Sequence, residues 1–161
     1  MDLTNWTDLG LFMLAYGTFL FAWFASYRAA RPRLAMTGMV LAVIAVFFDG
    51  LEDGCLLMLT PSLDASSVAL ELLPWMTGVK WLALGAIALP EAALLWNGSI
   101  ASRAGAVIAQ AAPVGSVAAL YAPATFGPLV SLAVTLAWLP CLANAVVRAR
   151  AGGLIATPEA R

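Results

Sequence analysis

The stretch that decides the fold of this chain is LAMTGMVLAVIAVFFDGLEDGCLLML, residues 34–59. Its first part is largely apolar, three acids follow at Asp49, Glu52 and Asp53, and the last four residues are apolar again. A helix needs about 20 apolar residues to cross a membrane, at about 1.5 Å of rise each. Because four residues are far too few for another crossing, the acids are predicted to lie inside one membrane-spanning helix, in its C-terminal half.

The three acids are also predicted to share one face of that helix. Residues spaced by three and four positions are neighbours on a helix surface, which is the spacing of Asp49, Glu52 and Asp53. The same face continues towards the N-terminus through small residues, namely Gly38, Ala42 and Ala45. Since small residues let helices approach closely, we expect this face to point into a helical bundle rather than towards lipid.

The composition of the whole chain is typical of an integral membrane protein. Its 161 residues are 63% hydrophobic and 11% charged, and the mean hydropathy is +0.92. This excludes an ordinary soluble domain and a disordered chain, and the net charge of −1 offers no basic surface for nucleic acid. The absence of histidine removes His-ligated haem, His-containing metal sites and nucleophile–histidine pairs. No cofactor is expected.

Hydropathy predicts an all-α, polytopic bundle of five spans in a single transmembrane domain, residues 1–161. The spans are predicted at about residues 9–27, 34–59, 75–96, 105–120 and 129–147. Between the second and third spans we expect a loop with a short interfacial helix, capped by Ser66 or Ser67.

The arginines predict the orientation of the bundle. With five spans and the N-terminus outside, every arginine in a loop or tail falls on the cytoplasmic side, and no lysine or arginine falls in a loop on the other side. The positive-inside rule therefore favours an outside N-terminus and a cytoplasmic C-terminus. The localisation we expect is a bacterial inner (plasma) membrane.

Lys80, in the third predicted span, is positioned to meet the acids. Counted from Pro74 it lies about 9 Å inside the span, and Glu52 and Asp53 lie about 9–10 Å inside theirs. Consecutive antiparallel helices would bring these groups to one level. We expect an ion pair from Lys80 to Asp53 or Glu52, with Asp49 deeper.

A second polar layer is predicted nearer the cytoplasmic side. Glu91 follows Lys80 by 11 residues, almost three helical turns, so the two share a face. Glu91 also lies at about the depth of Gln110 in the fourth span. A structural alternative is that Glu91 is hydrated near the interface or meets Arg103. Apolar residues are expected to separate the two layers, namely Leu84, Ile87, Ala42 and Ala45. This gap counts against a continuous proton path in a static bundle.

The buried acids outnumber the available cation. Asp49, Glu52, Asp53 and Glu91 against Lys80 give four negative charges minus one positive, or −3. Some carboxyls must be protonated, or a cation or a partner's basic residue must neutralise them. The Lys80 site can be a structural ion pair or a coupling site for protons or cations. It can also be a hard-cation site, with the three neighbouring acids binding Ca²⁺ or Mg²⁺.

These residues favour proton- or cation-linked transport or conduction of a small solute. Asp49 and Glu52 would bind the cation, Lys80 would be the internal counter-charge, and Glu91 with Gln110 would relay protons inward. An alternative is an accessory or assembly subunit, because small loops and uncompensated acids fit a partner with basic residues. A third is a membrane enzyme acting on lipid, but no nucleophile or metal-ligand motif supports it. Expected partners are the lipid bilayer and either a homo-oligomer or a larger membrane complex.

Overall fold

The computed structural model describes residues 6–60 and 67–155, and every element in these ranges is helical. The elements are the π-helical turn η1 (Asp8–Phe12), α2 (Met13–Ala25), α3 (Pro32–Leu59), α4 (Val68–Leu95), α5 (Ile100–Ala109), α6 (Ala111–Tyr121) and α7 (Pro123–Ile155). The predicted all-α class is confirmed.

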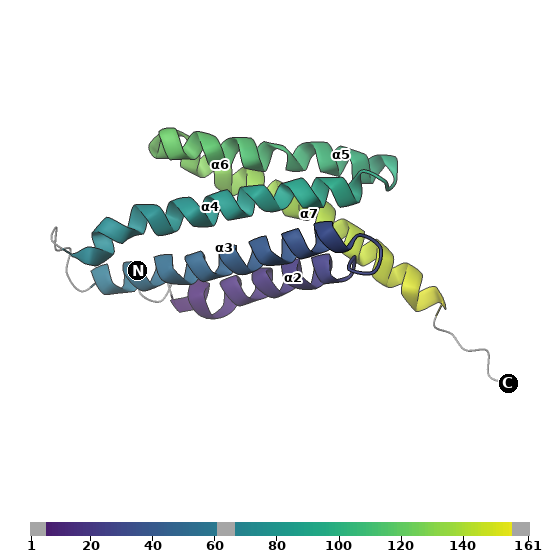
Figure 1. Cartoon of the computed structure of the whole chain (residues 1–161), viewed down its shortest axis with the longest axis horizontal. Helices are drawn as coiled ribbons and strands as arrows, with labels where there is room; N and C mark the ends of the chain where they lie inside the picture. The colour runs from purple at the N-terminus through teal and green to yellow at the C-terminus, as the bar shows by residue number, and fades with distance from the viewer. Residues whose placement is uncertain (1–5, 61–66, 156–161) are drawn as a thin grey trace.

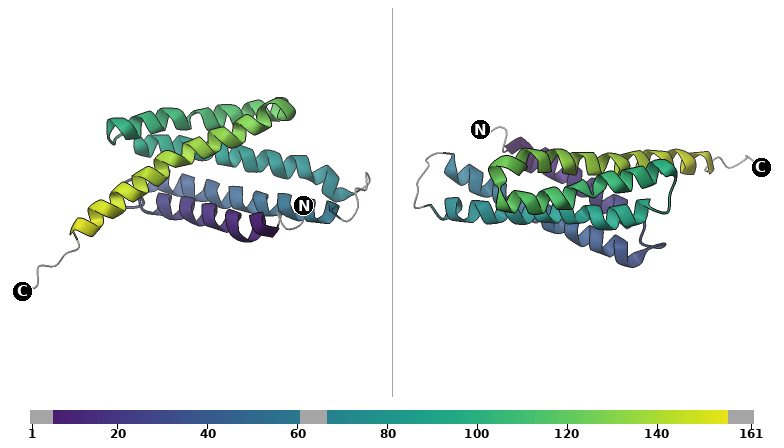
Figure 2. Two further views of the ribbon diagram at one scale, coloured as in Figure 1. Left: turned by 180° about the vertical axis from the view of Figure 1, so that it is seen from behind. Right: turned by 90° about the horizontal axis from the view of Figure 1, so that it is seen from above.

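The helices form an elongated bundle in which α2, α3 and α4 lie side by side (Figure 1). Helix α3 packs against α2 on one side and α4 on the other, and α4 also contacts α5 and α6. Helix α7 packs against α5 and α6, crosses the bundle obliquely, and reaches the α2–α3 side at its C-terminal end (Figure 2). This crossing brings residues of α7 next to α2, although the two helices are far apart in the sequence.

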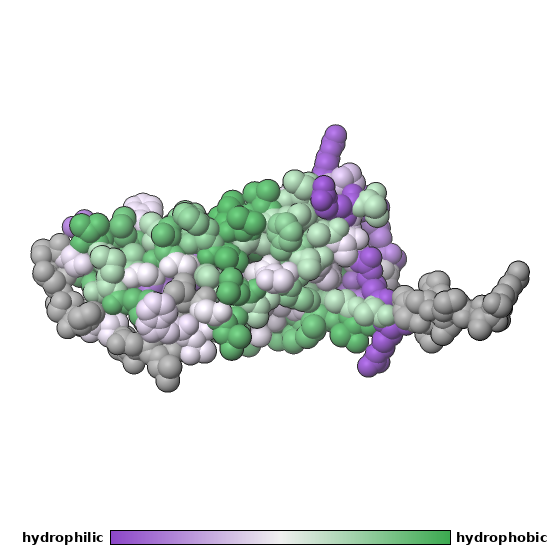
Figure 3. All heavy atoms as spheres, turned by 90° about the horizontal axis from the view of Figure 1, so that it is seen from below, coloured by the Kyte–Doolittle hydropathy of each residue, from purple (hydrophilic) through white to green (hydrophobic). Residues whose placement is uncertain are grey.

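Four helical segments are long and apolar enough to cross a membrane. They are Pro32–Leu59, Val68–Leu95, Ile100–Tyr121 and Pro123–Arg150. The first helix is apolar over Gly10–Ala25 but shorter. Apolar side chains cover much of the length of the bundle, while hydrophilic ones gather near its C-terminal end (Figure 3). The structure therefore fits an integral membrane protein with four such helices, and the fifth span, over residues 9–27, stays a prediction.

The helices run further than hydropathy predicted. The third span was expected to begin at residue 75, after a separate interfacial helix, but α4 begins at Val68 and continues through Pro74. Pro74 lies in the second turn, where it removes the helical hydrogen bond to the carbonyl of Leu70 without ending the helix. Ser67 precedes α4 but forms no side-chain cap, and residues 61–66, which include Ser66, lie outside the described residues.

The fourth predicted span is divided in two. Helix α5 ends before Gln110 and α6 begins after it. Pro113 explains the break, because it has no N–H for the carbonyl of Ala109 four residues earlier. Helix α7 begins at Pro123, six residues before the expected limit of residue 129, and runs through Pro128 and Pro140.

Close packing between helices depends on small residues, as was predicted from the face of α3 that carries them. Gly38, Ala42 and Ala45 are all buried. The ring of Phe24 on α2 lies directly over Gly38, where an added Cβ would collide with it. The expectation that this face points into the bundle is confirmed.

Candidate functional site

Lys80 of α4 holds two carboxylates of α3 together. Its Nζ lies 2.8 Å from Asp49 Oδ1 and also contacts Glu52 Oε2. Asp49 and Glu52 are three residues apart on one face of α3, so a single ammonium group reaches both. The predicted pair with Glu52 is present. The second partner is Asp49, which was predicted to lie deeper than the pair, rather than Asp53.

Each of the two carboxylates also accepts a hydrogen bond from a hydroxyl group. Tyr16 of α2 donates a hydrogen bond to Asp49 Oδ2 at 2.6 Å, and Thr77 of α4 donates one to Glu52 Oε1 at 2.7 Å. Each carboxylate thus meets Lys80 with one oxygen and a hydroxyl with the other. Sequence reasoning missed both hydroxyl residues, although Thr77 lies three residues before Lys80 and Tyr16 is a polar side chain in an apolar helix.

Asp53 is also buried, with 3% of its surface exposed. The ion pairs that the structure describes for Lys80 are with Asp49 and Glu52. Within residues 6–60 and 67–155, no group of three aspartate, glutamate or cysteine side chains is arranged to hold a metal ion. The described residues therefore give the predicted Ca²⁺ or Mg²⁺ site no geometric support.

A cavity of about 230 Å³ adjoins this cluster, between α2, α3, α4 and α7. Asp49 and Lys80 line it together with aromatic side chains and two hydroxyls of α7, namely Phe12, Tyr16, Trp81, Trp138, Ser131 and Thr135. The rings of Tyr16 and Trp138 stack with centroids 5.3 Å apart, and Lys80 Nζ lies 5.2 Å from the Trp81 ring centroid. Because aromatic faces attract cations, this environment suits a positively charged group.

Glu91, on the same helix, lies in a very different environment. It is 0% exposed, and neither carboxyl oxygen has a hydrogen-bond partner of normal geometry in the described part of the chain. Its polar neighbour is the thiol of Cys141 on α7, which is also fully buried. The alternative in which Glu91 is hydrated or meets Arg103 is wrong, since Arg103 is exposed and donates to the carbonyl of Trp96.

Gln110 lies near the level of Glu91, but it does not bond to the carboxyl. Its Nε2 donates to the backbone carbonyl of Ala88, one turn before Glu91, at 3.4 Å. The break between α5 and α6 at Gln110 leaves this side chain beside α4. Gln110 therefore contacts α4, but it does not form the predicted polar pair with the Glu91 carboxyl.

A layer of apolar residues separates the two sites, as expected, with the buried hydroxyl of Ser116 as an exception at its α6 side. Leu84, Ile87, Ala42 and Ala45 all belong to one buried core cluster. At this level Gly85 of α4 packs so closely on Ser116 of α6 that an added Cβ would collide with the hydroxyl. No polar side chain of the cluster around Lys80 is described in contact with Glu91.

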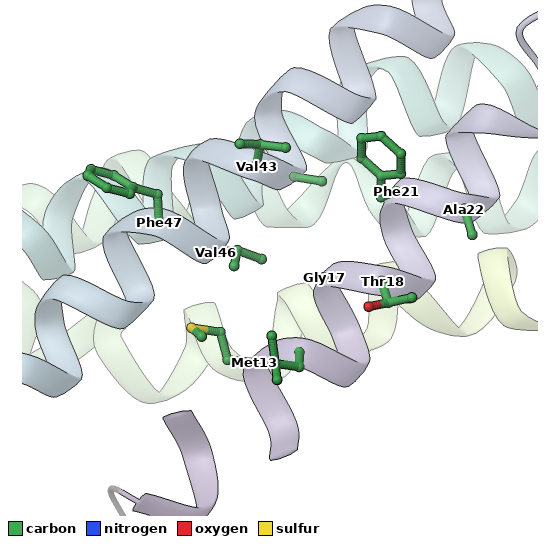
Figure 4. A pocket seen from close by; sticks show the side chains of 10 residues that line it. Met13, Gly17, Thr18, Phe21, Ala22, Val43, Val46 and Phe47 are labelled. Atoms are coloured by element: carbon green, nitrogen blue, oxygen red, sulfur yellow. The ribbon is translucent and has the colours of Figure 1, made fainter. Parts of the chain in front are cut away.

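A larger cavity, a groove of about 470 Å³, lies between α2 and α3 (Figure 4). Its walls are apolar or small side chains, with the hydroxyl of Thr18 as the exception. This groove has no charged group, so it offers no group for chemistry on a substrate. The Lys80 cavity, in contrast, combines charge, hydroxyls and aromatic rings.

Comparison with known proteins leaves the function to be inferred from these residues. No protein-family model, curated protein or solved structure matches the chain.

Proposed function

We propose that this integral membrane protein carries out proton- or cation-linked transport or conduction of a small solute. In this proposal the chain crosses the membrane five times, with the N-terminus outside and the arginine-rich end in the cytoplasm of a bacterial cell. The observation that carries the proposal is the ammonium of Lys80, held by two buried carboxylates at the wall of a cavity.

The charge balance of the site supports cation binding. Asp49 and Glu52 contribute two negative charges and Lys80 one positive charge, which leaves −1. One proton or one monovalent cation would neutralise the group. Since an uncompensated charge in the hydrocarbon costs about 2.5–3.5 kcal/mol on insertion scales, the site favours taking up that cation. A cation bound at Asp49 would weaken the ion pair between Asp49 and Lys80. Binding of the cation would thereby change the packing of α3 on α4.

The location of the cavity supports access from one end. The cavity lies along α4 on the Lys80 side of Leu84, whereas Glu91 lies beyond Leu84 and Ile87 and is fully buried. A solute in the cavity would therefore face a closed apolar layer in this conformation. Transport requires that layer to open.

Two prolines support a hinge at the closed layer. Pro90 directly precedes Glu91 in α4, and Pro140 directly precedes Cys141 in α7. Each removes a helical hydrogen bond, so both helices have a weak point where they meet at the buried carboxyl. In our proposal Glu91 is the inner proton acceptor that becomes accessible when these helices bend, with Gln110 beside it.

Proton flux into vesicles tests the proposal. The full chain is reconstituted with entrapped pyranine, a potassium diffusion potential is applied with valinomycin, and the internal pH is recorded. We expect flux above that of protein-free vesicles, and its loss in Asp49→Asn and Glu91→Gln. Glu71→Gln is the matched control, because Glu71 is an exposed acid in the first turn of the same helix.

Normal flux in both site variants would contradict the proposal. A preparation that always contains a second protein at fixed ratio, with no flux, would instead favour the accessory-subunit function. Native mass spectrometry of the same preparation separates these outcomes.

A further inference from the structure

A second cavity with polar chemistry lies at the arginine-rich end of the bundle, between α2 and α7. It has a volume of about 390 Å³ and is lined by Phe19, Ala22, Trp23, Ser26, Ala145 and Arg148. Its walls are apolar except at one corner, where Ser26 and Arg148 lie. The corner lies near the C-terminal end of α2, whereas Tyr16 of the Lys80 site lies in its first half, so the two cavities are distinct.

The side chain of Arg148 is held in place at this corner. One of its terminal nitrogens donates to Ser26 Oγ at 3.1 Å, and its guanidinium carbon lies 4.4 Å from the ring centroid of Tyr27. Ser26 in turn donates to the carbonyl of Trp23 at 2.7 Å, and Tyr27 donates to Asn144 of α7 at 2.7 Å. The Arg148 side chain is exposed, and these neighbours orient its guanidinium at the mouth of the cavity.

Hydrogen-bond donors exceed acceptors here. A guanidinium carries five N–H donors, and Ser26 is the acceptor described for Arg148. The salt bridges in the described part of the chain belong to Lys80, so no described acid neutralises Arg148. The indole N–H of Trp23, a buried residue that lines the cavity, has no acceptor among the described residues. An anion with several oxygens would satisfy this corner.

We propose that the cavity binds a phospholipid with an anionic head group. Its phosphate contacts Arg148, and one acyl chain lies along Phe19, Ala22 and Ala145. Guanidinium and phosphate pair through two parallel hydrogen bonds, and basic pockets between transmembrane helices are a recurring form of head-group site. The volume falls in the range of about 300–1,000 Å³ found for small-molecule pockets.

The position of the cavity supports the same ligand. Exposed Arg28 and Arg31, in the segment between α2 and α3, lie at the same end of the bundle. Hydrophilic side chains gather there, next to the apolar surface that covers the rest of the bundle (Figure 3). A phospholipid has this arrangement, with its charge at the end of an apolar chain. The neighbouring groove between α2 and α3 has no charged group and selects no head group.

Lipid titration of the full chain in detergent tests the proposal. Phosphatidylglycerol, phosphatidylcholine and oleate are each added in mixed micelles, and bound lipid is counted by native mass spectrometry. We expect phosphatidylglycerol to bind preferentially, and Arg148→Gln to weaken it about fivefold. Arg148→Lys keeps the charge but loses the paired geometry, so an intermediate affinity is expected. Ala145→Leu fills the cavity and should weaken binding while Arg148 is retained.

Arg150→Gln is the matched control, with the same charge change on the same helix but no place in the cavity. Several outcomes overturn the proposal: equal binding of phosphatidylcholine, binding of oleate alone, or an equal loss of affinity in Arg150→Gln. Unfolding temperatures of all variants, measured without added lipid, show that each comparison concerns folded protein.

Discussion

Two carboxyl groups on neighbouring helices, Asp49 and Glu91, are buried to a similar degree but have very different polar partners. Asp49 is 4% exposed and meets an ammonium and a phenol hydroxyl. Glu91 is 0% exposed and has a thiol as its polar neighbour. An ionised group away from water must be paired, whereas a neutral acid can be buried at much lower cost. The first site is therefore built to hold charge and the second to exclude it.

The difference also concerns access. The Asp49 site adjoins a cavity with aromatic and hydroxyl walls, whereas Glu91 lies in the core beside Cys141 of α7 and lines none of the described cavities. In the proposed function, a proton reaches the first site through this cavity, whereas it reaches the second after the packing of the helices opens. Changes that remove charge should thus have unequal effects at the two sites.

The largest effect is expected when Lys80 is replaced by methionine. The variant leaves Asp49 and Glu52 buried without their cation, and removing one partner of a buried ion pair costs about 3–5 kcal/mol. Chemical denaturation in detergent, followed by circular dichroism, measures the loss in the free energy of unfolding.

Lys80→Arg is the control, because it keeps a cation between the two carboxylates. Asp49→Asn and Glu52→Gln added to Lys80→Met should restore much of the stability, since the two acids that paired with Lys80 are then uncharged. If Lys80→Met is as stable as the wild type, the carboxylates are not charged in the folded protein.

A smaller effect is expected for Tyr16→Phe. The phenol hydroxyl donates a short hydrogen bond to the Asp49 carboxylate, and bonds to charged groups contribute about 1.5–3 kcal/mol. The same denaturation measurement applies. Tyr121→Phe is the matched control, since Tyr121 is 86% exposed. Equal losses in the two variants would show that Tyr16 stabilises the bundle through its ring stack on Trp138 alone.

Much of the first site follows from the sequence, because helical spacing and depth depend on residue number. The shared face of the three acids follows from spacing alone, and the level of Lys80 follows from the rise per residue. The predicted depths were accurate to about one turn, which is the interval between Asp49 and Asp53. That interval decides which acid contacts Lys80.

The partners on other helices could not be predicted in the same way. Periodicity identifies the buried face of a helix but not the helix against which that face packs. Tyr16 contacts Asp49 because α2 lies beside α3. Cys141 contacts Glu91 because α7 crosses the bundle obliquely (Figure 2). The same crossing brings Arg148 to Ser26, a contact between residues 122 positions apart in the chain. Crossing angles depend on side-chain packing over the whole interface.

The smallest effect is expected for Glu91→Gln, and it distinguishes the two sites most directly. If the Glu91 carboxyl is neutral in its apolar surroundings, the change exchanges one uncharged group for another of similar shape. The free energy of unfolding should then change by about 1 kcal/mol or less, the net contribution of one neutral hydrogen bond. Asp49→Asn makes the same acid-to-amide change at the paired site, where it weakens the bond to Lys80 and should cost about 1.5–3 kcal/mol. Both variants are measured in the same denaturant series. If Glu91→Gln loses as much free energy of unfolding as Asp49→Asn, Glu91 is also ionised and is neutralised by a cation. The contrast between a charge-holding and a charge-excluding site would then be wrong.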